Sequence, residues 1–472
     1  MPFVDFNTLI KLLDVILHLL FVEQFNTFIV SKRSLSYKLF CHWVGLHHRF
    51  YYPQHTYNGM ERVPADGNAI VMVGNHQNCM MDPVNVEYAL TDRKAYCLVR
   101  GDIFRVNKLF TKFLHWLGLL PVNRLNFEGL QGSGNAKEAN KNTFSDARKW
   151  LIQGNTLILF PEAGHQNKRW LGYFSLGYLN LAFEAAQEAD FKKEVYVMPF
   201  GHHYGNYFHS RYGFVLNFGE PIALSPYYDR YREKPRTTMR EVNALVEKQI
   251  SSLMLDIRDL DHYAAIDALR GSEVGKQYAV KQGANPKHLS EKLQADKKLA
   301  AALPKEVDEL DELENVERET FELGMRDWVL AKKPGVLNLA SRIALLVLGA
   351  PLAAACLPAW VYLLLPRIMF GKKINGAVDD MFRSTWLFGF AVLVISPLVW
   401  ILPGVILLLV KWWIGLAYLA AMPLMVWYLV VYTKLWRKTC GVYRYVALGK
   451  KGRDLAERRE KAVGIISDRT ER

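Results

Sequence analysis

The pattern of apolar and polar positions divides the chain into segments with different structures. Between residues 7 and 22, polar side chains recur every three or four positions among Leu, Ile, Val and Phe: Asn7, Lys11, Asp14 and His18. This spacing predicts an amphipathic helix, which lies either in the bilayer interface or on the protein's own core. We expect residues 1–50 to form amphipathic, membrane-associated helices.

Residues 51–225 show a second pattern, in which short apolar runs alternate with amphipathic stretches. It predicts strands at 69–74, 96–99, 119–122, 156–160, 195–198 and 214–218, and helices at 107–117, 142–153 and 175–188. Such alternation is typical of an α/β layered domain with a mostly parallel sheet, whose ligands gather at the carboxyl ends of the strands. The loops after the strands are therefore where chemistry is expected.

The remainder of the chain is predicted to be helical. Residues 226–335 are polar, and their acidic stretch at 304–327 is typical of a solvated helical face or a linker. An α-helical membrane domain is predicted at 336–435, because residues 343–365 carry no charge and residues 385–432 carry only Lys411.

The basic loop after residue 365 and the basic tail at 436–472 both favour the cytosol. An even number of crossings between them follows, with helices at 385–408 and 412–432 and Lys411 at the turn on the far side. Residues 343–365 contain Pro351 and Pro358 and form either a full span or a re-entrant hairpin.

Composition narrows the class of protein further. The 472 residues carry 59 Lys and Arg against 46 Asp and Glu, a net charge of +13. The tail explains much of this excess and suits an anionic membrane surface, so we expect the lipid bilayer as a partner and no nucleic acid.

Five scattered cysteines without a CxxC pair indicate neither a disulfide framework nor a zinc site, and the first residues lack the features of a secretory signal. We expect an integral membrane protein whose 51–225 domain is cytosolic.

Candidate chemistry begins with His76 and Asp82, which follow the strand at 69–74. A carboxylate one turn beyond a histidine can fix its tautomer, so that the other ring nitrogen takes a proton from a hydroxyl. Asp82 before Pro83 is equally typical of a helix N-cap, in which case His76 is only a polar side chain.

Three further blocks follow later strands. Arg124 ends one strand with a group suited to binding phosphate. The next loop brings together a carboxylate, a glycine and three potential cations: Glu162, Gly164, His165, Lys168 and Arg169. Pro199 is expected to mark the end of the strand that begins at Val195.

In this order and at these separations, the four blocks resemble the glycerolipid acyltransferase family, the 1-acylglycerol-3-phosphate and glycerol-3-phosphate acyltransferases. The resemblance covers residues 55–225 and implies an acyltransferase domain at 51–225 with His76 as general base and Asp82 as its orienting partner. Arg124 and the turn from Glu162 to Gly164 would then bind the acceptor phosphate, aided by Lys168 or Arg169. The reaction implied needs no metal or cofactor. Its substrates are an acyl thioester, of coenzyme A or acyl carrier protein, and a phosphorylated glycerol, either glycerol-3-phosphate or lysophosphatidate.

Two departures from the family pattern are visible. Five residues separate His76 from Asp82 where the family usually has four, and Ala163 stands where a glycine is expected. They leave open a catalytically inactive, membrane-anchored lipid-binding or scaffolding protein with the same fold. A metal hydrolase that uses His165, His202, His203 and His209 is disfavoured because no HExxH motif is present.

Overall fold

The computed structural model describes residues 34–105, 107–122, 133–162, 168–303, 308–374 and 382–470. It divides into two compact units, one of residues 1–254 and 380–385, the other of residues 255–379 and 386–472. The helix predicted at 7–22, with Asn7, Lys11, Asp14 and His18, lies outside the described residues.

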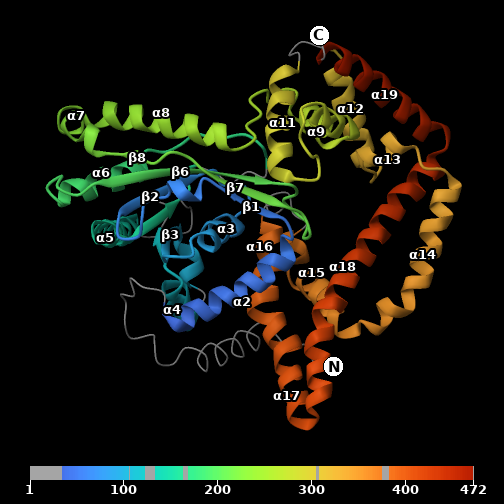
Figure 1. Ribbon diagram of the computed structural model, residues 1–472, viewed down its shortest axis with the longest axis horizontal. Coiled ribbons are helices and arrows are strands. Elements are labelled where there is room, and N and C mark those ends of the chain that lie inside the picture. Colours follow the sequence, from blue (N-terminus) through green and yellow to red (C-terminus); the bar gives the residue numbers. More distant parts are fainter. Residues whose placement is uncertain are drawn as a thin grey trace. The chain divides into compact units, whose positions relative to one another are not determined.

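Unit 1 is built on one sheet with the strand order β1-β7-β6-β2-β5-β3-β4 (Figure 1). Its strands are β1 (His55–Asn58), β2 (Ala69–Gly74), β3 (Ala95–Arg100), β4 (Leu119–Val122), β5 (Thr156–Leu159), β6 (Val195–Tyr204), β7 (Phe214–Phe218) and β8 (Ile222–Ala223). Every pairing is parallel except those of β6 with β7 and with β8. The predicted α/β domain with a mostly parallel sheet is confirmed.

Helices cover both faces of this sheet. The helices of unit 1 are α2 (Leu35–Tyr51), α3 (Met81–Ala89), α4 (Lys108–Trp116), α5 (Ser133–Ile152), α6 (Gly177–Glu188), α7 (Tyr228–Glu233) and α8 (Pro235–Leu253). Apolar residues of α5, α6 and α8 pack on one face around Val71 and Val197, which are fully buried. Helices α2 and α3 lie on the other face, and the compact unit runs past the predicted boundary at residue 225 to the end of α8.

One strand differs from its prediction. Pro199 does not end β6, which continues to Tyr204. Proline is tolerated inside this strand because β6 changes antiparallel partner there, from β8 at Val197 to β7 at Phe200, so no regular ladder bond requires its missing N–H. The extension brings Tyr204 to the site described below.

Unit 2 is helical throughout its described residues. Its helices are α9 (Tyr263–Gly271), α10 (Glu273–Lys281), α11 (Leu289–Ala302), α12 (Asp308–Glu322), α13 (Asp327–Lys332), α14 (Val336–Ala355), α15 (Val361–Ile374), α16 (Arg383–Phe390), α17 (Leu402–Val410), α18 (Trp412–Leu448) and α19 (Lys450–Thr470). The first residues of α16 belong to unit 1, and a π-helical segment, Ala391–Ile401, joins α16 to α17.

Among the described residues, three helical stretches are long and apolar enough to cross a membrane: Val336–Ala355, Arg383–Val410 and Trp412–Leu448. The basic tail packs as α19 against α12 and α13. There Arg458 pairs with Glu312 at 2.6 Å and with Glu319 at 3.0 Å, and Arg459 pairs with Asp327. The acidic stretch of the sequence is therefore a partner of the tail, and these two arginines are already neutralised within unit 2.

Candidate active site

The site lies where the parallel strands β2 and β5 end beside the middle of β6. Val73 of β2 is in register with Leu159 of β5 and with Pro199 of β6, so the residues that follow β2 and β5 meet at one edge of the sheet. Gly74 closes β2 against β6, and a Cβ atom in its place would lie 2.0 Å from Phe200 Cε2. A larger residue would displace the turn that leads to His76.

His76 and Asp82 form a hydrogen-bonded pair, with 2.8 Å between Nδ1 and Oδ2. The Asp82 side chain is fully buried, whereas the His76 side chain is 13% exposed. Because Nδ1 is engaged by the carboxylate, Nε2 is the ring nitrogen that a base mechanism would use.

Asp82 does not act as a helix N-cap, so that interpretation of the sequence is wrong. Helix α3 begins at Met81 without a side-chain cap. The Asp82 carboxylate turns back instead, and Oδ2 accepts hydrogen bonds of 2.8 Å from the backbone N–H groups of Gln77 and Asn78. Three donors on one oxygen fix both the carboxylate and the loop that carries His76.

The other oxygen of Asp82 is held by β6. Tyr204 donates its hydroxyl to Oδ1 at 2.5 Å and accepts a hydrogen bond of 2.7 Å from Asn85 Nδ2. Asn85 Oδ1 in turn lies 2.8 Å from His48 Nε2 on α2. A continuous chain of buried polar groups therefore runs from His76 through Asp82 to α2. Burial and the Asp82 charge raise the pKa of Tyr204, which stays a neutral donor.

Two aromatic groups complete the surroundings of the pair. The Phe160 ring, directly after β5, stacks on the His76 ring with centroids 4.3 Å apart. His202 on β6 is fully buried with Nδ1 4.0 Å from Asp82 Oδ1, and burial lowers the pKa of this histidine.

Burial alone would raise the pKa of Asp82, but the imidazoles of His202 and His76 and the Tyr204 hydroxyl outweigh it and lower that pKa. Asp82 is thus a carboxylate at neutral pH.

The loop after β5 reaches the same pair. Glu162 is buried, and its Oε1 lies 3.4 Å from the backbone N of His76. Lys168 is exposed, and its backbone oxygen accepts a hydrogen bond of 2.7 Å from Gln77 Nε2. Arg169 is buried, donates to the Tyr204 carbonyl at 2.8 Å and lies over the Tyr207 ring. Arg169 therefore anchors the loop, and Lys168 is the cation of the two that faces solvent.

The remaining predicted site residues, Arg124, Gly164 and His165, lie outside the described residues, as does Ala163. Within the described part of the chain, no group of three or more His, Cys, Asp or Glu residues is arranged to hold a metal ion.

The longer spacing between His76 and Asp82 is accommodated in the turn between them. Cys79 has a φ of 47°, which is rare for residues other than glycine. The next backbone N–H, of Met80, donates to Thr385 Oγ1 at 3.1 Å. Burial raises the pKa of the Cys79 thiol to about 11, so it is protonated. The additional residue therefore leaves the pair in contact.

Sequence reasoning missed Tyr204, Asn85 and His48. The sequence does contain a pattern that indicates Tyr204. Phe200, His202 and Tyr204 occupy every second position, so in a strand their side chains share one face. The assumption that Pro199 ends the strand concealed this pattern.

Parts of this chain are similar to known acyltransferases. Residues 54–203 match the family model described as Acyltransferase. Glycerol-3-phosphate O-acyltransferase 2 of Saccharomyces cerevisiae is 31% identical over 134 residues, which are 28% of this chain and only 18% of the yeast protein. The crystal structure of the 1-acyl-sn-glycerophosphate (LPA) acyltransferase PlsC from Thermotoga maritima is similar at 18% identity and a TM-score of 0.34, covering 52% of this chain and 97% of that one.

Proposed function

We propose that this protein is a membrane-bound enzyme that transfers a fatty acyl group from a thioester to a glycerophosphate hydroxyl, since residues 54–203 match the family model described as Acyltransferase. The acceptor is glycerol-3-phosphate or lysophosphatidate, the donor is an acyl thioester of coenzyme A or acyl carrier protein, and the domain faces the cytosol. The reaction would serve phospholipid biosynthesis.

The His76–Asp82 pair is the observation that carries this proposal. Asp82 accepts the Nδ1 proton of His76, and Nε2 takes the proton of the acceptor hydroxyl as its oxygen attacks the thioester carbonyl. The C–O bond forms, the C–S bond breaks, and the imidazolium returns its proton to the departing thiolate. A buried carboxylate with a lowered pKa stabilises the imidazolium at the moment that it forms.

Acceptor orientation is assigned to the loop after β5. Lys168 is exposed beside the catalytic loop and can meet a phosphate, with Arg124, Gly164 and His165 as further members proposed from the family resemblance. Holding the phosphate fixes the hydroxyl near His76, and such positioning can supply several kcal/mol of the barrier. Arg169 contributes by keeping this loop against β6.

The test is acyl transfer by the purified full-length protein in detergent. Long-chain acyl-coenzyme A is offered with radiolabelled glycerol-3-phosphate and, in parallel, with radiolabelled lysophosphatidate. We expect product from one acceptor and its loss in His76→Ala and in Asp82→Asn, with thermal unfolding to verify that both variants are folded. Full activity in His76→Ala would exclude His76 as the general base. Absence of product from either acceptor with either kind of donor would favour the scaffolding alternative.

A further inference from the structure

A cluster of cations surrounds one tryptophan in unit 2, away from any group used above. Trp328 of α13 is half-buried. The Arg342 guanidinium carbon of α14 and the Lys438 Nζ of α18 each lie 5.6 Å from its ring centroid. The consecutive helices α13 and α14, together with the later helix α18, thus place two cations at one aromatic ring, whose faces attract cations.

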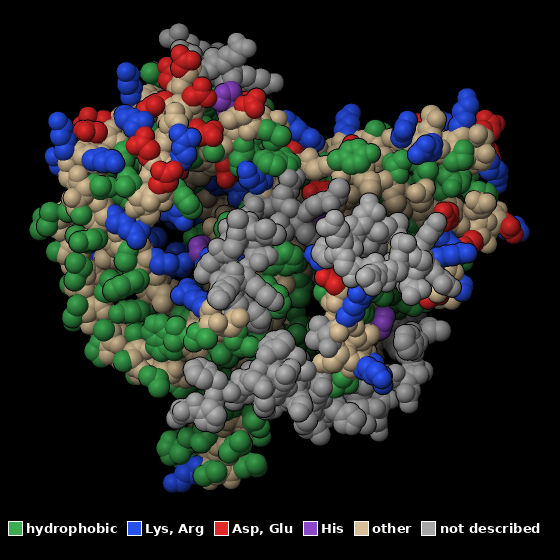
Figure 2. Space-filling view, turned by 180° about the vertical axis from the view of Figure 1, so that it is seen from behind, with side chains coloured by type: hydrophobic (Ala, Val, Ile, Leu, Met, Phe, Trp, Pro, Cys, Tyr) green, Lys and Arg blue, Asp and Glu red, His purple; other side chains and the backbone are tan. Residues whose placement is uncertain are grey.

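Further positive charges lie around this pair. Lys434, Lys332 and Lys276 also lie close enough to Lys438 to act on its charge, and of these Lys276 is paired with Glu273 at 3.0 Å. On the helical part of the chain, Figure 2 shows Lys and Arg side chains both among Asp and Glu side chains and beside a broad hydrophobic surface. Gathering like charges is unfavourable unless an anion neutralises them.

The cluster lies at the level where the apolar stretches begin. Arg342 directly precedes the uncharged run that starts at Ile343, and Lys434 follows the run that ends at Tyr432. The two helices are aligned at this level, because the Tyr432 hydroxyl donates to the Leu346 carbonyl at 3.1 Å.

Exposed tryptophans mark both ends of the apolar part of α18. They are Trp412 and Trp436, which are 69% and 57% exposed. The helix between them is about 36 Å long at roughly 1.5 Å per residue, slightly more than a hydrocarbon core of about 30 Å. Because tryptophan favours the membrane–water interface, the cations around Trp328 lie among lipid headgroups.

We propose that Arg342 and Lys438, which lie at the Trp328 ring, bind the phosphate of an anionic phospholipid in the leaflet next to α13, with Lys434 adding positive charge beside Lys438. The occupant is a lipid rather than a soluble phosphate because the site opens at headgroup level beside apolar helix surface. This site differs from general adsorption of the basic tail, since Arg458 and Arg459 are occupied by acids of α12 and α13.

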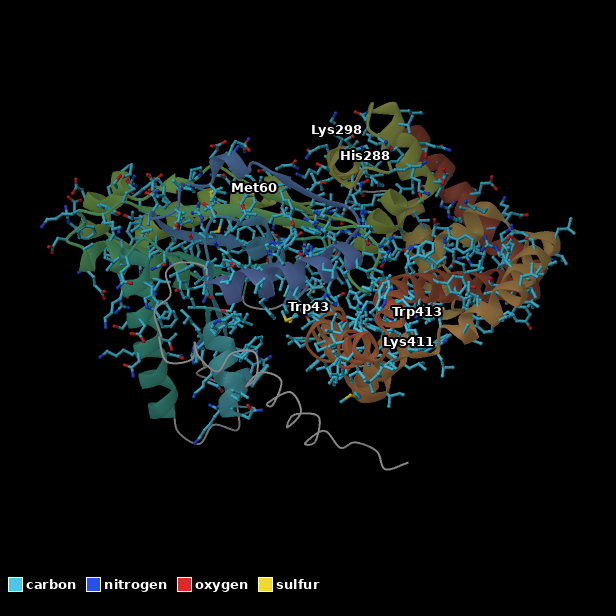
Figure 3. The ribbon with its side chains drawn as sticks, turned by 60° about the horizontal axis from the view of Figure 1, so that its bottom comes forward. Trp43, Met60, His288, Lys298, Lys411 and Trp413 are labelled. Carbon is cyan, nitrogen blue, oxygen red and sulfur yellow. The ribbon has the colours of Figure 1, made fainter. Side chains whose placement is uncertain are left out.

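The test measures lipid retention by native mass spectrometry of the full-length, detergent-purified protein. Phosphatidylglycerol and phosphatidylcholine are titrated onto wild type, onto the double variant Arg342→Gln/Lys438→Gln, and onto Lys411→Gln. Lys411 is a matched control, because it is exposed and lies with Trp413 at the opposite end of α18, at the turn after α17 (Figure 3).

Wild type should retain phosphatidylglycerol in preference to phosphatidylcholine. Since each cation at the headgroup level contributes roughly fivefold, the double variant should bind it about thirtyfold more weakly, and Lys411→Gln should match wild type. Equal retention of both lipids, or an equal loss in Lys411→Gln, would overturn the proposal. Displacement of the lipid by millimolar inorganic phosphate would also overturn it, by identifying a soluble ligand. Thermal unfolding verifies that each variant is folded.

Discussion

Tyr204→Phe removes one hydroxyl and tests whether the buried polar chain orients the catalytic pair. The phenol donates to Asp82 Oδ1 at 2.5 Å, and in the variant that fully buried oxygen loses this donor. A hydrogen bond to a charged group contributes about 1.5–3 kcal/mol. If that energy serves to hold the carboxylate toward His76, its loss lowers kcat by about 10-fold to 150-fold.

The same substitution should also change the pH profile of kcat/KM, which it would not do if the Tyr204 hydroxyl served only the stability of the fold. With one donor fewer, Asp82 becomes a stronger base and binds the His76 imidazolium more tightly, so the acid limb of the pH profile of kcat/KM moves to higher pH. Tyr178→Phe is the control, because it also removes a buried hydroxyl, one that donates to Asn243 at 2.9 Å far from the pair.

The assay is acyl transfer by the two variants over a range of pH, together with their unfolding temperatures. We expect both proteins to be destabilised by about 1–3 kcal/mol, since each loses a buried hydrogen bond, but only Tyr204→Phe to lose kcat. An unchanged pH profile and kcat in folded Tyr204→Phe would refute the reasoning. So would an equal loss of activity in Tyr178→Phe.

Four further substitutions probe other parts of the structure. Thr385→Val removes the acceptor of the Met80 N–H and should lower kcat severalfold with the KM for acyl donor unchanged, as steady-state kinetics can verify. Lys168→Gln should chiefly raise the KM for the acceptor in the same assay. Gly74→Ala forces a Cβ onto Phe200, should cost about 1–3 kcal/mol by thermal unfolding, and should abolish transfer. Burial and Asp327 raise the pKa of Glu317 from 4.5 to about 7, so the folded state holds this proton more tightly and unit 2 loses stability as pH rises from 4.5 through 7. Glu317→Gln should flatten that dependence in melts at pH 5 and pH 8.

Sequence periodicity was sufficient for most of the sheet because parallel strands buried on both faces are continuous apolar runs. β2 and β7 have the predicted bounds, and the pairing of His76 with Asp82 was also expected from their separation. Two features could not be predicted from local sequence patterns. Continuation of β6 past Pro199 depends on which strand pairs with it on each side, and the partners of the basic tail depend on how α19 packs against α12.

The turn between His76 and Asp82 contains one residue more than expected, and Thr385 helps to hold it. Left-handed backbone at Cys79 costs roughly 1–2 kcal/mol, so the turn needs compensation. Thr385 supplies it by accepting the Met80 N–H, and Asp82 supplies more through Gln77 and Asn78.

Thr385 lies at the start of the apolar stretch Arg383–Val410, and its neighbour Ser384 accepts the Tyr51 hydroxyl at 3.0 Å and donates to the Tyr207 carbonyl at 2.5 Å. Ser384 and Thr385, near the start of this candidate span, belong to unit 1 and are hydrogen-bonded within it. A loop one residue shorter would lack the Cys79–Met80 corner as it is formed here. The turn that carries the additional residue is therefore held by a hydroxyl at the start of an apolar helical stretch.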